Sequence, residues 1–444
     1  MNISYSKQLP VRHDVDVFVA GGGPAGVSAA VAAARMGKSV FLAESGFSLG
    51  GAAVNMLVPA FMPFGDRVTF YAEGIGREIY DRIASEAPER FKTYCPDGIP
   101  VETLKLIYDD MIVKSGCALA FGTDVTDAVK EGNSVTHAVL SAREGAYAVK
   151  AKVFIDATGD GLLCERAGAE TKYGDENGLS MAATLCGLWA GFEFDRFEYP
   201  ANKYIDRAFG DGVFTNHDRH LPGIWPILAN HPGMPDGVGG SNAGHVYGVD
   251  PRSSESLTPA IMKARRQLLE YRRYFREYMS GCENAEIIFT APMLGIRESR
   301  RVTCDYTLNV EDFKRQAVFG DEIGRFNYGV DIHSSTNDSA GYEKFIGEYT
   351  SLRYKDGESY GIPLRSLIVK GFDNLLCAGR CIGTDRYMLS SVRVMPGCFI
   401  TGQAAGVAAA QALEQGAGDV RLADVVEIQK KLVLMGAYLP NAGK

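Results

Sequence analysis

Cysteine is scarce in this sequence, and long apolar runs are missing. The 444 residues include nine cysteines, an odd number, and none of them forms a Cys-x-x-Cys pair. This excludes a disulfide scaffold and indicates a reducing, cytoplasmic setting. No stretch approaches the ~20 consecutive apolar residues that span a bilayer, and MNISYSKQLPVRHDVDVF lacks the apolar core of a secretory signal. No membrane partner is therefore expected.

A surplus of positive charge is missing as well. The chain has 46 lysines and arginines against 54 aspartates and glutamates, which gives a net charge of −8. Such a chain does not attract nucleic acid, which is excluded as a partner. The rest of the composition, 46% hydrophobic and 23% charged, is typical of a globular protein, and the length suggests two or three structural units.

Two chemical patterns are also missing. His217, His220 and His231 lack a third and fourth ligand at fixed spacing, so no metal is expected. No G-x-S-x-G elbow is present, which argues against nucleophilic hydrolysis. Neither class of enzyme is therefore supported by the sequence.

Glycine, by contrast, is abundant, with 51 residues. Four of them lie in GGGPAG, Gly21–Gly26, between the apolar run VDVFVA and a run of small residues. The pattern predicts a buried strand over 15–20, a helix over 25–36 that ends at Gly37, and a second strand over 39–43. This order is typical of a βαβ unit with G-x-G-x-x-G at its first turn.

Each glycine of this motif has a separate expected role. Gly21 makes the turn, Gly23 lets a diphosphate approach the backbone, and Gly26 lets the helix pack against the strand. The helix N-terminus then offers free N–H groups and partial positive charge to phosphates. Glu44, at the end of the second strand, is placed to accept hydrogen bonds from ribose hydroxyls. A purely structural turn is the alternative.

The rest of the chain bears on which dinucleotide is bound, because nicotinamide enzymes carry this motif too. Residues 117–155 alternate in short runs and predict a β-meander, which leads into a buried strand ending at DATGDG, Asp156–Gly161. The segment NLLCAGR predicts another buried strand, and residues 402–413 predict a second helix of small residues.

This order resembles the two-dinucleotide-binding-domain flavoproteins, more narrowly their FAD-dependent oxidoreductase branch, which is distantly similar to fumarate-reductase-type flavoproteins. The narrower resemblance is carried by LGIRESRRVTCDYTL (294–308), DIHSS (331–335), YGIPLRSLI (360–368) and the run from LLCAGRCIG to GQAAGVAAA (375–410). The resemblance covers nearly the whole chain. It implies FAD as cofactor and an α/β fold: a Rossmann-like FAD-binding domain with a β-meander, plus an inserted α+β substrate or cap domain.

The resemblance also implies which residues meet FAD. They divide into contacts with the adenosine side, the diphosphate, the ribitol and the isoalloxazine. The implied residues are Gly21, Gly23, Pro24, Ala25, Gly26, Glu44, Ser45, Gly50, Gly51, Val125, Ala157, Thr158, Gly159, Gly379 and Arg380. No redox dithiol follows the pair Gly50-Gly51, which argues against a disulfide reductase. Departures from the common pattern at Val54-Asn55, Cys304 and Thr384–Tyr387 bear on the substrate more than on the cofactor.

The predicted domains follow from this reading. The FAD-binding domain is discontinuous, over 1–172 and 355–413; residues 173–354 form the inserted substrate or cap domain, and 414–444 form a helical tail with an amphipathic helix over 420–435. Within the insertion, residues 258–281 predict a long helix with Thr258 as N-cap and Pro259 in its first turn.

A helix N-terminus is expected at the flavin end. Pro396 and Gly397 are predicted to lie just before a thin helix, whose N-terminus would stabilise negative charge near N1 of reduced flavin. A tightly packed core helix is the alternative. Arg393 lies beside the same segment and is a candidate for polarising the substrate, pairing with an anionic flavin or bracing a loop.

Three arginines, Arg297, Arg300 and Arg301, are candidates for binding a carboxylate, because guanidinium groups match it in a forked geometry. Ion pairs with Glu298 or Asp305 are the alternative for each of them. Arg297 is the choice for the ligand side, because it follows a predicted strand and a glycine.

Two histidines are candidates for proton transfer. His333, in VDIHSST, is the first, because imidazole titrates near neutral pH, and His245, in SNAGHVYG, is the second. The function expected from all these residues is an FAD-dependent oxidoreductase that passes a hydride or electron pair between flavin N5 and a small polar or anionic organic molecule. A flavin-binding protein with a structural nucleotide and a nicotinamide-only dehydrogenase are the alternatives. The electron acceptor, the direction of electron flow and the oligomeric state are not predicted.

Overall fold

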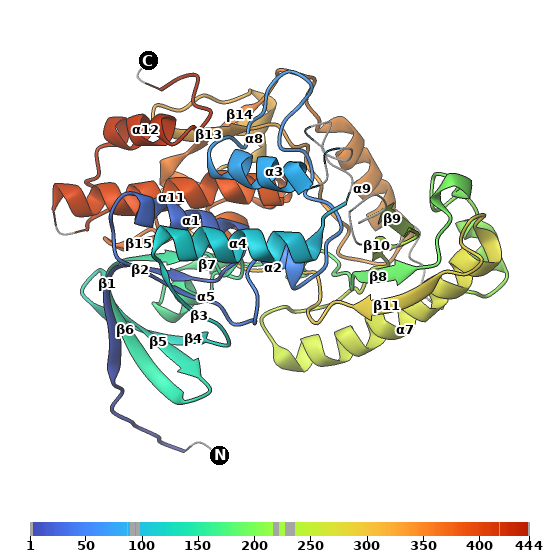
Figure 1. The fold of residues 1–444 in the computed structure, drawn as a ribbon, viewed down its shortest axis with the longest axis horizontal. Helices are drawn as coiled ribbons and strands as arrows, with labels where there is room; N and C mark the ends of the chain where they lie inside the picture. Colours follow the sequence, from blue (N-terminus) through green and yellow to red (C-terminus); the bar gives the residue numbers. More distant parts are fainter. Residues whose placement is uncertain are drawn as a thin grey trace.

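The computed structural model describes residues 3–86, 88, 94, 98–215, 222–226, 236–416 and 418–442. The histidines considered above as metal ligands, His217, His220 and His231, lie outside the described residues. The architecture is α/β, with a large central sheet, helices against it and a smaller sheet at one side (Figure 1). The predicted fold class is therefore confirmed.

The central sheet has the strand order β3-β2-β1-β6-β5-β4, with β15 also paired to β6. The contacts of β1 with β2 and β6, of β2 with β3 and of β6 with β15 are parallel, whereas β4, β5 and β6 form an antiparallel meander. The strands are β1 (Val11–Ala20), β2 (Val40–Ala43), β3 (Ala118–Ala120), β4 (Asp124–Glu131), β5 (Ser134–Ala142), β6 (Gly145–Asp156) and β15 (Leu375–Cys377).

Strand β6 joins the two parts of this sheet because it is long enough to pair with different neighbours along its length. Residues Gly145–Lys150 pair with β5, and Phe154–Asp156 pair with β15. The chain therefore returns to the central sheet after about 200 intervening residues. Strands β6 and β15 end at the same edge of the sheet, where β1 and β2 end as well.

Helix α1 (Pro24–Arg35) follows β1 directly and packs against α11 (Met395–Gln415) (Figure 1). The helices approach closely because α11 presents glycines to α1: a Cβ at Gly402 would lie 2.1 Å from the Ala25 carbonyl oxygen, and one at Gly406 would lie 2.3 Å from that of Ala29. Small residues therefore set the spacing of the two helices.

Helix α11 begins earlier than predicted. Pro396 and Gly397 lie in its first turn rather than before it. Proline is tolerated there because its missing N–H would have no partner within the helix in any case. Two further helices, α3 (Ile75–Glu86) and α4 (Val101–Ser115), lie beside α1, and α12 (Val425–Leu434) packs on α11 within the predicted range 420–435 (Figure 1).

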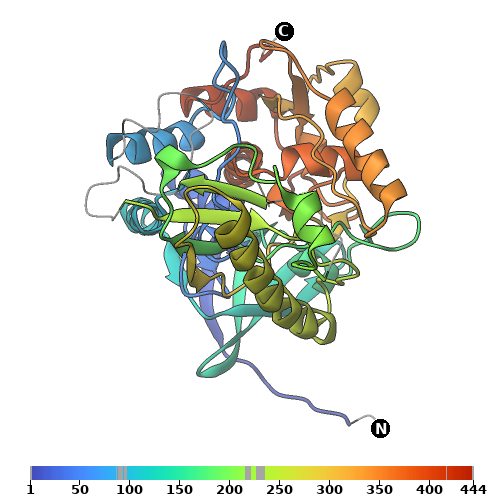
Figure 2. The same cartoon turned by 90° about the vertical axis from the view of Figure 1, so that its right-hand side faces the viewer.

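The smaller sheet has the order β11-β8-β10-β9 and lies beside α7 (Figure 2). Its strands are β8 (Gly187–Ala190), β9 (Pro222–Pro226), β10 (Gly239–Ala243) and β11 (Glu286–Thr290). Trp189 of β8 meets Phe275 of α7 edge to face, with ring centroids 5.5 Å apart. Buried aromatic side chains therefore hold this helix against the sheet.

Helix α7 (Ser254–Tyr278) differs from the prediction at both ends. Its N-cap is Ser253, whose side chain accepts a hydrogen bond from Ser256 N, so Pro259 lies inside the helix rather than at its start. Thr258 lies inside the helix, where its hydroxyl donates to the Ser254 carbonyl, and Ser253, five residues earlier, supplies the capping acceptor. The helix ends at Tyr278, before Gly281.

Short elements connect these units. The strand β13 pairs with β14, and residues 304–308 bridge to residues 369 and 384, so part of the predicted insertion contacts the segment after 355. The division into domains stays a prediction.

No helix among the described residues is long and apolar enough to cross a membrane. The remaining elements are α2 (Gly51–Val54), α5 (Leu162–Arg166), β7 (Thr171–Lys172), α6 (Ile205–Gly210), β12 (Arg301–Val302), α8 (Val310–Lys314), β13 (Glu322–Phe326), α9 (Ser339–Ser351), β14 (Tyr360–Pro363) and α10 (Arg386–Val392).

Candidate functional site

A cavity of about 380 Å³ lies beyond the carboxyl ends of β1, β2, β6 and β15. This edge of a parallel sheet is where ligands bind in open α/β folds. Its far end is lined by residues next to the smaller sheet, including Thr184, Asn242 and Arg297. The cavity therefore runs from the first βαβ turn to the unit built around the smaller sheet.

The first turn of α1 forms one wall of the cavity. Its N-cap is Gly23, without a side-chain capping bond, and Pro24 is at the first position. A Cβ at Gly23 would meet only the Gly51 Cα, at 3.9 Å, so the space above this backbone is open. Gly21 has φ +92°, a conformation that favours glycine. The open backbone and the uncapped helix N-terminus fit a diphosphate.

Glu44 follows β2 and is buried at the same wall. Its carboxylate accepts hydrogen bonds from Gly22 N at 2.6 Å and from Gly46 N at 2.7 Å. A carboxylate offers about four acceptor positions, so capacity is left for a donor in the cavity. This arrangement fits a ribose hydroxyl.

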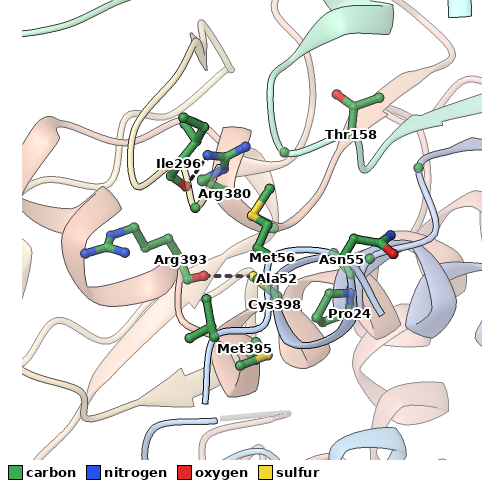
Figure 3. A pocket seen from close by; sticks show the side chains of 18 of the residues that line it. Pro24, Ala52, Asn55, Met56, Thr158, Ile296, Arg380, Arg393, Met395 and Cys398 are labelled. Carbon is green, nitrogen blue, oxygen red and sulfur yellow. Dashed lines mark hydrogen bonds between the residues drawn. The ribbon is translucent and has the colours of Figure 1, made fainter. Parts of the chain in front are cut away.

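The loop after β6 lines the cavity next to the Gly21 turn. Asp156 is buried and accepts hydrogen bonds from the Thr158 backbone N–H and hydroxyl and from Cys164 N, which holds the loop in place. Arg380 crosses the cavity wall and contacts Asp160 Oδ1 through Nη2 at 2.6 Å, and it also donates to the Ile296 carbonyl (Figure 3). Segments from three regions of the sequence therefore meet here.

Most of the residues predicted to bind FAD line this cavity. They come from the βαβ turn, the end of β2, the meander and the loops after β6 and β15. They are Gly21, Gly23, Pro24, Ala25, Glu44, Ser45, Gly51, Val125, Ala157, Thr158, Gly159, Gly379 and Arg380. The individual contacts of these residues with FAD stay predictions.

Four predicted residues are not part of the cavity lining: Gly26, Gly50, Pro396 and Gly397. A Cβ at Gly26 would lie 1.7 Å from the Gly21 carbonyl oxygen, and one at Gly397 would lie 2.4 Å from that of Val392. These two glycines therefore allow close approach of the backbone to itself. At Gly50, with φ +111°, the added atom would meet the Val54 side chain at 2.4 Å.

The start of α11 lines the cavity through Val394, Met395 and Cys398, and Figure 3 shows the last two of these. Val394 is the N-cap and makes no side-chain capping bond, so the partial positive charge of this helix end faces the cavity. The Cys398 thiol donates to the Arg393 carbonyl at 3.2 Å, and burial raises its pKa to about 12. The thiol is therefore protonated and unsuited to nucleophilic attack.

Arg297 is the one of the three candidate arginines that lines the cavity among the described residues. It is 7% exposed, and its guanidinium donates to the Ala182 carbonyl and Thr184 hydroxyl, both at 2.8 Å, and to Asn242 Oδ1 at 3.2 Å. In the same segment, Arg301 pairs with Glu298, as the alternative reading expected. Arg300 Nη2 lies 3.9 Å from Glu165 Oε1.

Next to Arg297, a carboxylate, two histidines and a second arginine form a connected group. Arg393 Nη2 contacts Asp331 Oδ2 at 3.1 Å, and His333 Nε2 lies 3.4 Å from Asp331 Oδ1. On the other side of its ring, His333 Nδ1 is 3.2 Å from His245 Nε2. Asp331, His333 and Arg393 line the cavity, whereas His245 lies behind His333.

His333 was chosen because imidazole titrates near neutral pH, and its pKa in the folded protein corrects that expectation. Burial and the positive charge of Arg297 lower it to about 3, against the opposing effect of Asp331. The ring is therefore neutral at neutral pH rather than titrating there. Burial would raise the pKa of Asp331, but His333 and the guanidinium groups of Arg393 and Arg297 outweigh it, and the pKa falls well below its usual range. Because His333 is neutral, the two arginines are the charges that keep Asp331 ionised.

Sequence reasoning missed three polar residues of this end. Asp331 stands two residues before His333 in the DIHSS motif, and Asn242 stands three residues before His245. Both could have been found from the sequence motifs, because each lies two or three residues before a histidine that was already a candidate. Thr184 had no such signal, since its position beside Arg297 depends on the pairing of Thr184 with Gly295.

The fold and cavity define a class of protein. Parallel strands end at a cavity with an uncapped glycine turn at one end, a second helix N-terminus near the other, and arginines and histidine beside it. This is the arrangement of a dinucleotide-dependent oxidoreductase.

Comparison with protein families identifies the member of that class. The profile of the family described as FAD dependent oxidoreductase matches residues 16–432, and the chain belongs to this family. The protein is therefore an FAD-dependent oxidoreductase with FAD as its cofactor. A comparison with curated protein sequences found no significant match.

Comparison with solved structures gives matches of low sequence identity. A geranylgeranyl bacteriochlorophyll reductase-like protein from Thermoplasma acidophilum is 13% identical over 95% of this chain and 83% of its own, with a TM-score of 0.45. A p-nitrophenol 4-monooxygenase from Pseudomonas putida is 11% identical over 95% and 85%, also with a TM-score of 0.45. The myxobacterial chondrochloren halogenase is 12% identical over 95% and 78%, with a TM-score of 0.45. At these scores the structures say nothing about the substrate of this chain.

Proposed function

We propose that this protein transfers a hydride or electron pair between flavin N5 and a small anionic organic molecule bound at the Arg297 end of the cavity. The observation that carries the proposal is the convergence of Arg297, Arg393 and His333 on that end, beside the start of α11. FAD supplies the hydride or electron chemistry when bound. The chain supplies binding, orientation and charge.

Charge favours an anion over a neutral or cationic molecule. The Arg393 guanidinium pairs with the Asp331 carboxylate, the Arg297 guanidinium is close enough to lower the pKa of that carboxyl, and His333 is neutral. The group therefore carries net positive charge in a buried setting, where water screens it little. A carboxylate matches a guanidinium group well, because it accepts from two parallel N–H donors.

Arg297 is oriented before any substrate arrives. Its three neutral acceptors, Ala182 O, Thr184 Oγ1 and Asn242 Oδ1, hold the guanidinium plane from two elements of the chain. A fixed group loses little side-chain entropy on binding, which makes it suited to positioning a substrate.

We further infer how the chain holds FAD. The Gly23 backbone and the first N–H groups of α1 receive the diphosphate, Glu44 receives the adenosine ribose, and the start of α11 stabilises negative charge near N1. What supports this assignment is that all three features line one continuous cavity.

The test is anaerobic reduction of the FAD-loaded protein by a panel of small organic acids, each paired with its amide or methyl ester. We expect bleaching of the flavin colour by one or more acids and a loss of at least tenfold in rate for the neutral partner. A flavin that no member bleaches, or that the neutral compounds bleach equally well, would overturn the proposal.

The Arg297→Lys variant sharpens this test, because lysine keeps the charge but loses the forked geometry. We expect about a tenfold or larger loss in kcat/KM for the acid, which corresponds to ~1.4 kcal/mol or more. Arg300→Lys, in the same segment but outside the cavity lining, is the matched control and should stay near the parent value.

A further inference from the structure

The ring of His333 is held from both sides by groups of different hydrogen-bonding character. Its Nε2 faces Asp331 Oδ1 at 3.4 Å, and its Nδ1 faces His245 Nε2 at 3.2 Å. Both histidines are buried, at 6% and 3% exposure, so water does not substitute freely for these partners. The two contacts restrict where the ring proton is placed.

Asp331 determines the first contact. Its other oxygen, Oδ2, receives Arg393 Nη2 at 3.1 Å, which is the environment of an ionised carboxylate. An ionised carboxylate only accepts hydrogen bonds, so the nitrogen that faces it must be the protonated one. A lone pair on Nε2 would face negative charge instead.

The second contact follows from the first. A neutral imidazole carries one ring proton, so a proton on Nε2 leaves a lone pair on Nδ1. That lone pair needs a donor, and the atom at 3.2 Å is His245 Nε2. The hydrogen bonds therefore run in one direction, from His245 to His333 to Asp331. The lowered pKa of His333 agrees with a neutral ring.

We propose that His245 is a positioning residue that holds His333 as the neutral Nε2–H tautomer, so that His333 offers the cavity a hydrogen-bond donor and no base. The 3.4 Å separation from Asp331 is long for an N–H···O bond, and both residues line the cavity. A ligand oxygen bound there would share this N–H with Asp331 Oδ1, which remains its partner in the protein.

The inference has a consequence for the substrate class, and this consequence rests on the proposed function. A neutral N–H donor beside two guanidinium groups stabilises negative charge on an oxygen, as at an oxyanion site. The substrate is then a molecule with a carbonyl or carboxylate oxygen next to the reacting carbon. His333 keeps its proton throughout, and any proton transfer falls to another group.

The test is NMR of the FAD-loaded protein labelled with ¹⁵N-histidine, without substrate. Long-range ¹H–¹⁵N spectra distinguish protonated from unprotonated ring nitrogens, and His333→Asn assigns the signals. At pH 7 we expect His333 to show a protonated Nε2 and an unprotonated Nδ1 that accepts a hydrogen bond. The opposite tautomer, or a doubly protonated ring, would overturn the proposal.

Variants of His245 test its positioning role. His245→Phe should shift the His333 Nδ1 signal toward that of an unbonded lone pair, and His245→Gln, whose amide can donate, should restore part of the shift. His137→Gln, on the middle meander strand β5, is the control and should leave the signal unchanged. An unchanged His333 signal in His245→Phe would contradict the inference. If that variant does not fold, the parent tautomer and His245→Gln still decide the matter.

The outcomes separate this inference from the proposed function. The tautomer is measured without substrate, so it can hold even where no organic acid bleaches the flavin. Conversely, acids can bleach the flavin of a protein whose His333 is the Nδ1–H tautomer, in which case the proposed function stands and the positioning role fails.

Discussion

At the residue scale, the chemistry of His333 comes from its neighbours more than from imidazole itself. In the sequence it is one of seven histidines. In the fold it is buried beside Arg297, so the charged form of the ring is penalised twice, by lost hydration and by a like charge. The DIHSS motif by itself indicates a functional histidine. Its burial and the charge of Arg297 decide that the ring is neutral.

The stability of the protein should therefore depend on His333 in mildly acidic solution. The pKa is about 3 in the folded protein, against 6.5 for an ordinary histidine, so the unfolded chain binds a proton that the folded chain does not. The contribution is fully present above pH 6.5 and is lost as the pH falls toward 3, with a slope of at most ~1.4 kcal/mol per pH unit.

Urea denaturation of the parent and His333→Gln between pH 4.5 and 7.5 measures this effect. The free energy of unfolding of the parent should fall more steeply with decreasing pH than that of the variant. Carboxylates other than Asp331, which contacts His333, cancel in the difference. A difference between the two proteins that does not change with pH would contradict the prediction.

At the element scale, the contact between α1 and α11 shows how small residues convert sequence into geometry. The predicted helix over 25–36 is confirmed as α1. It consists mostly of small residues, and ten of its twelve residues are buried. Gly402 and Gly406 of α11 have no room for a Cβ against the α1 backbone. The two helices can therefore cross closely enough for both N-termini to reach the cavity.

Gly402→Ala should destabilise the protein, although alanine has the higher helix propensity. The added Cβ would lie 2.1 Å from the Ala25 carbonyl oxygen, so a backbone must move. Overpacking of this kind costs about 1–3 kcal/mol. We expect a lower Tm by calorimetry and a lower FAD content.

Gly347→Ala in α9 is the matched control. No atom lies within 4 Å of a Cβ at this exposed helical glycine, so the substitution should be neutral or stabilise by up to about 1 kcal/mol. Equal effects of the two substitutions would show that helix propensity, and not the contact between the helices, decides the outcome.

The helices α7 and α11 also show why element boundaries were predicted less well than element types. Both contain a proline near the start, and local rules allow several starting positions around it. Ser253 caps α7 one turn before the predicted Thr258, and α11 begins before Pro396 because its first turn packs at the cavity. Tertiary contacts therefore determine which of several locally acceptable residues begins each helix.

At the scale of the whole molecule, the cavity depends on segments that are far apart in the chain. Its walls include residues within 21–25, 43–62, 157–162 and 378–398, with Arg297 and His333 from the intervening region. FAD that binds across all of these walls should stabilise them together, because binding to the folded state alone shifts the folding equilibrium.

Gly23→Ala tests this coupling. Its backbone, at φ −71°, suits alanine, and the new Cβ makes only one ordinary contact, so the protein should fold. The methyl group should occupy the space of the diphosphate, and FAD content by absorbance should fall at least tenfold. Hydrogen exchange should then speed up in all four wall segments. Gly210→Ala in α6, with open space around its Cβ, is the control. Faster exchange confined to residues 21–26 would count against a cofactor that spans the cavity.

The sequence by itself determined the βαβ unit, the glycine turn and the meander, because these depend on local backbone sterics and on periodicity. The cofactor followed from the resemblance of its motifs to a family of flavoproteins. Only the tertiary structure decided which of three neighbouring arginines faces the cavity, that Asp331 joins His333 to Arg393, and that His333 is neutral. Burial and the approach of charges depend on which distant segments meet, and no local pattern in the chain encodes that meeting.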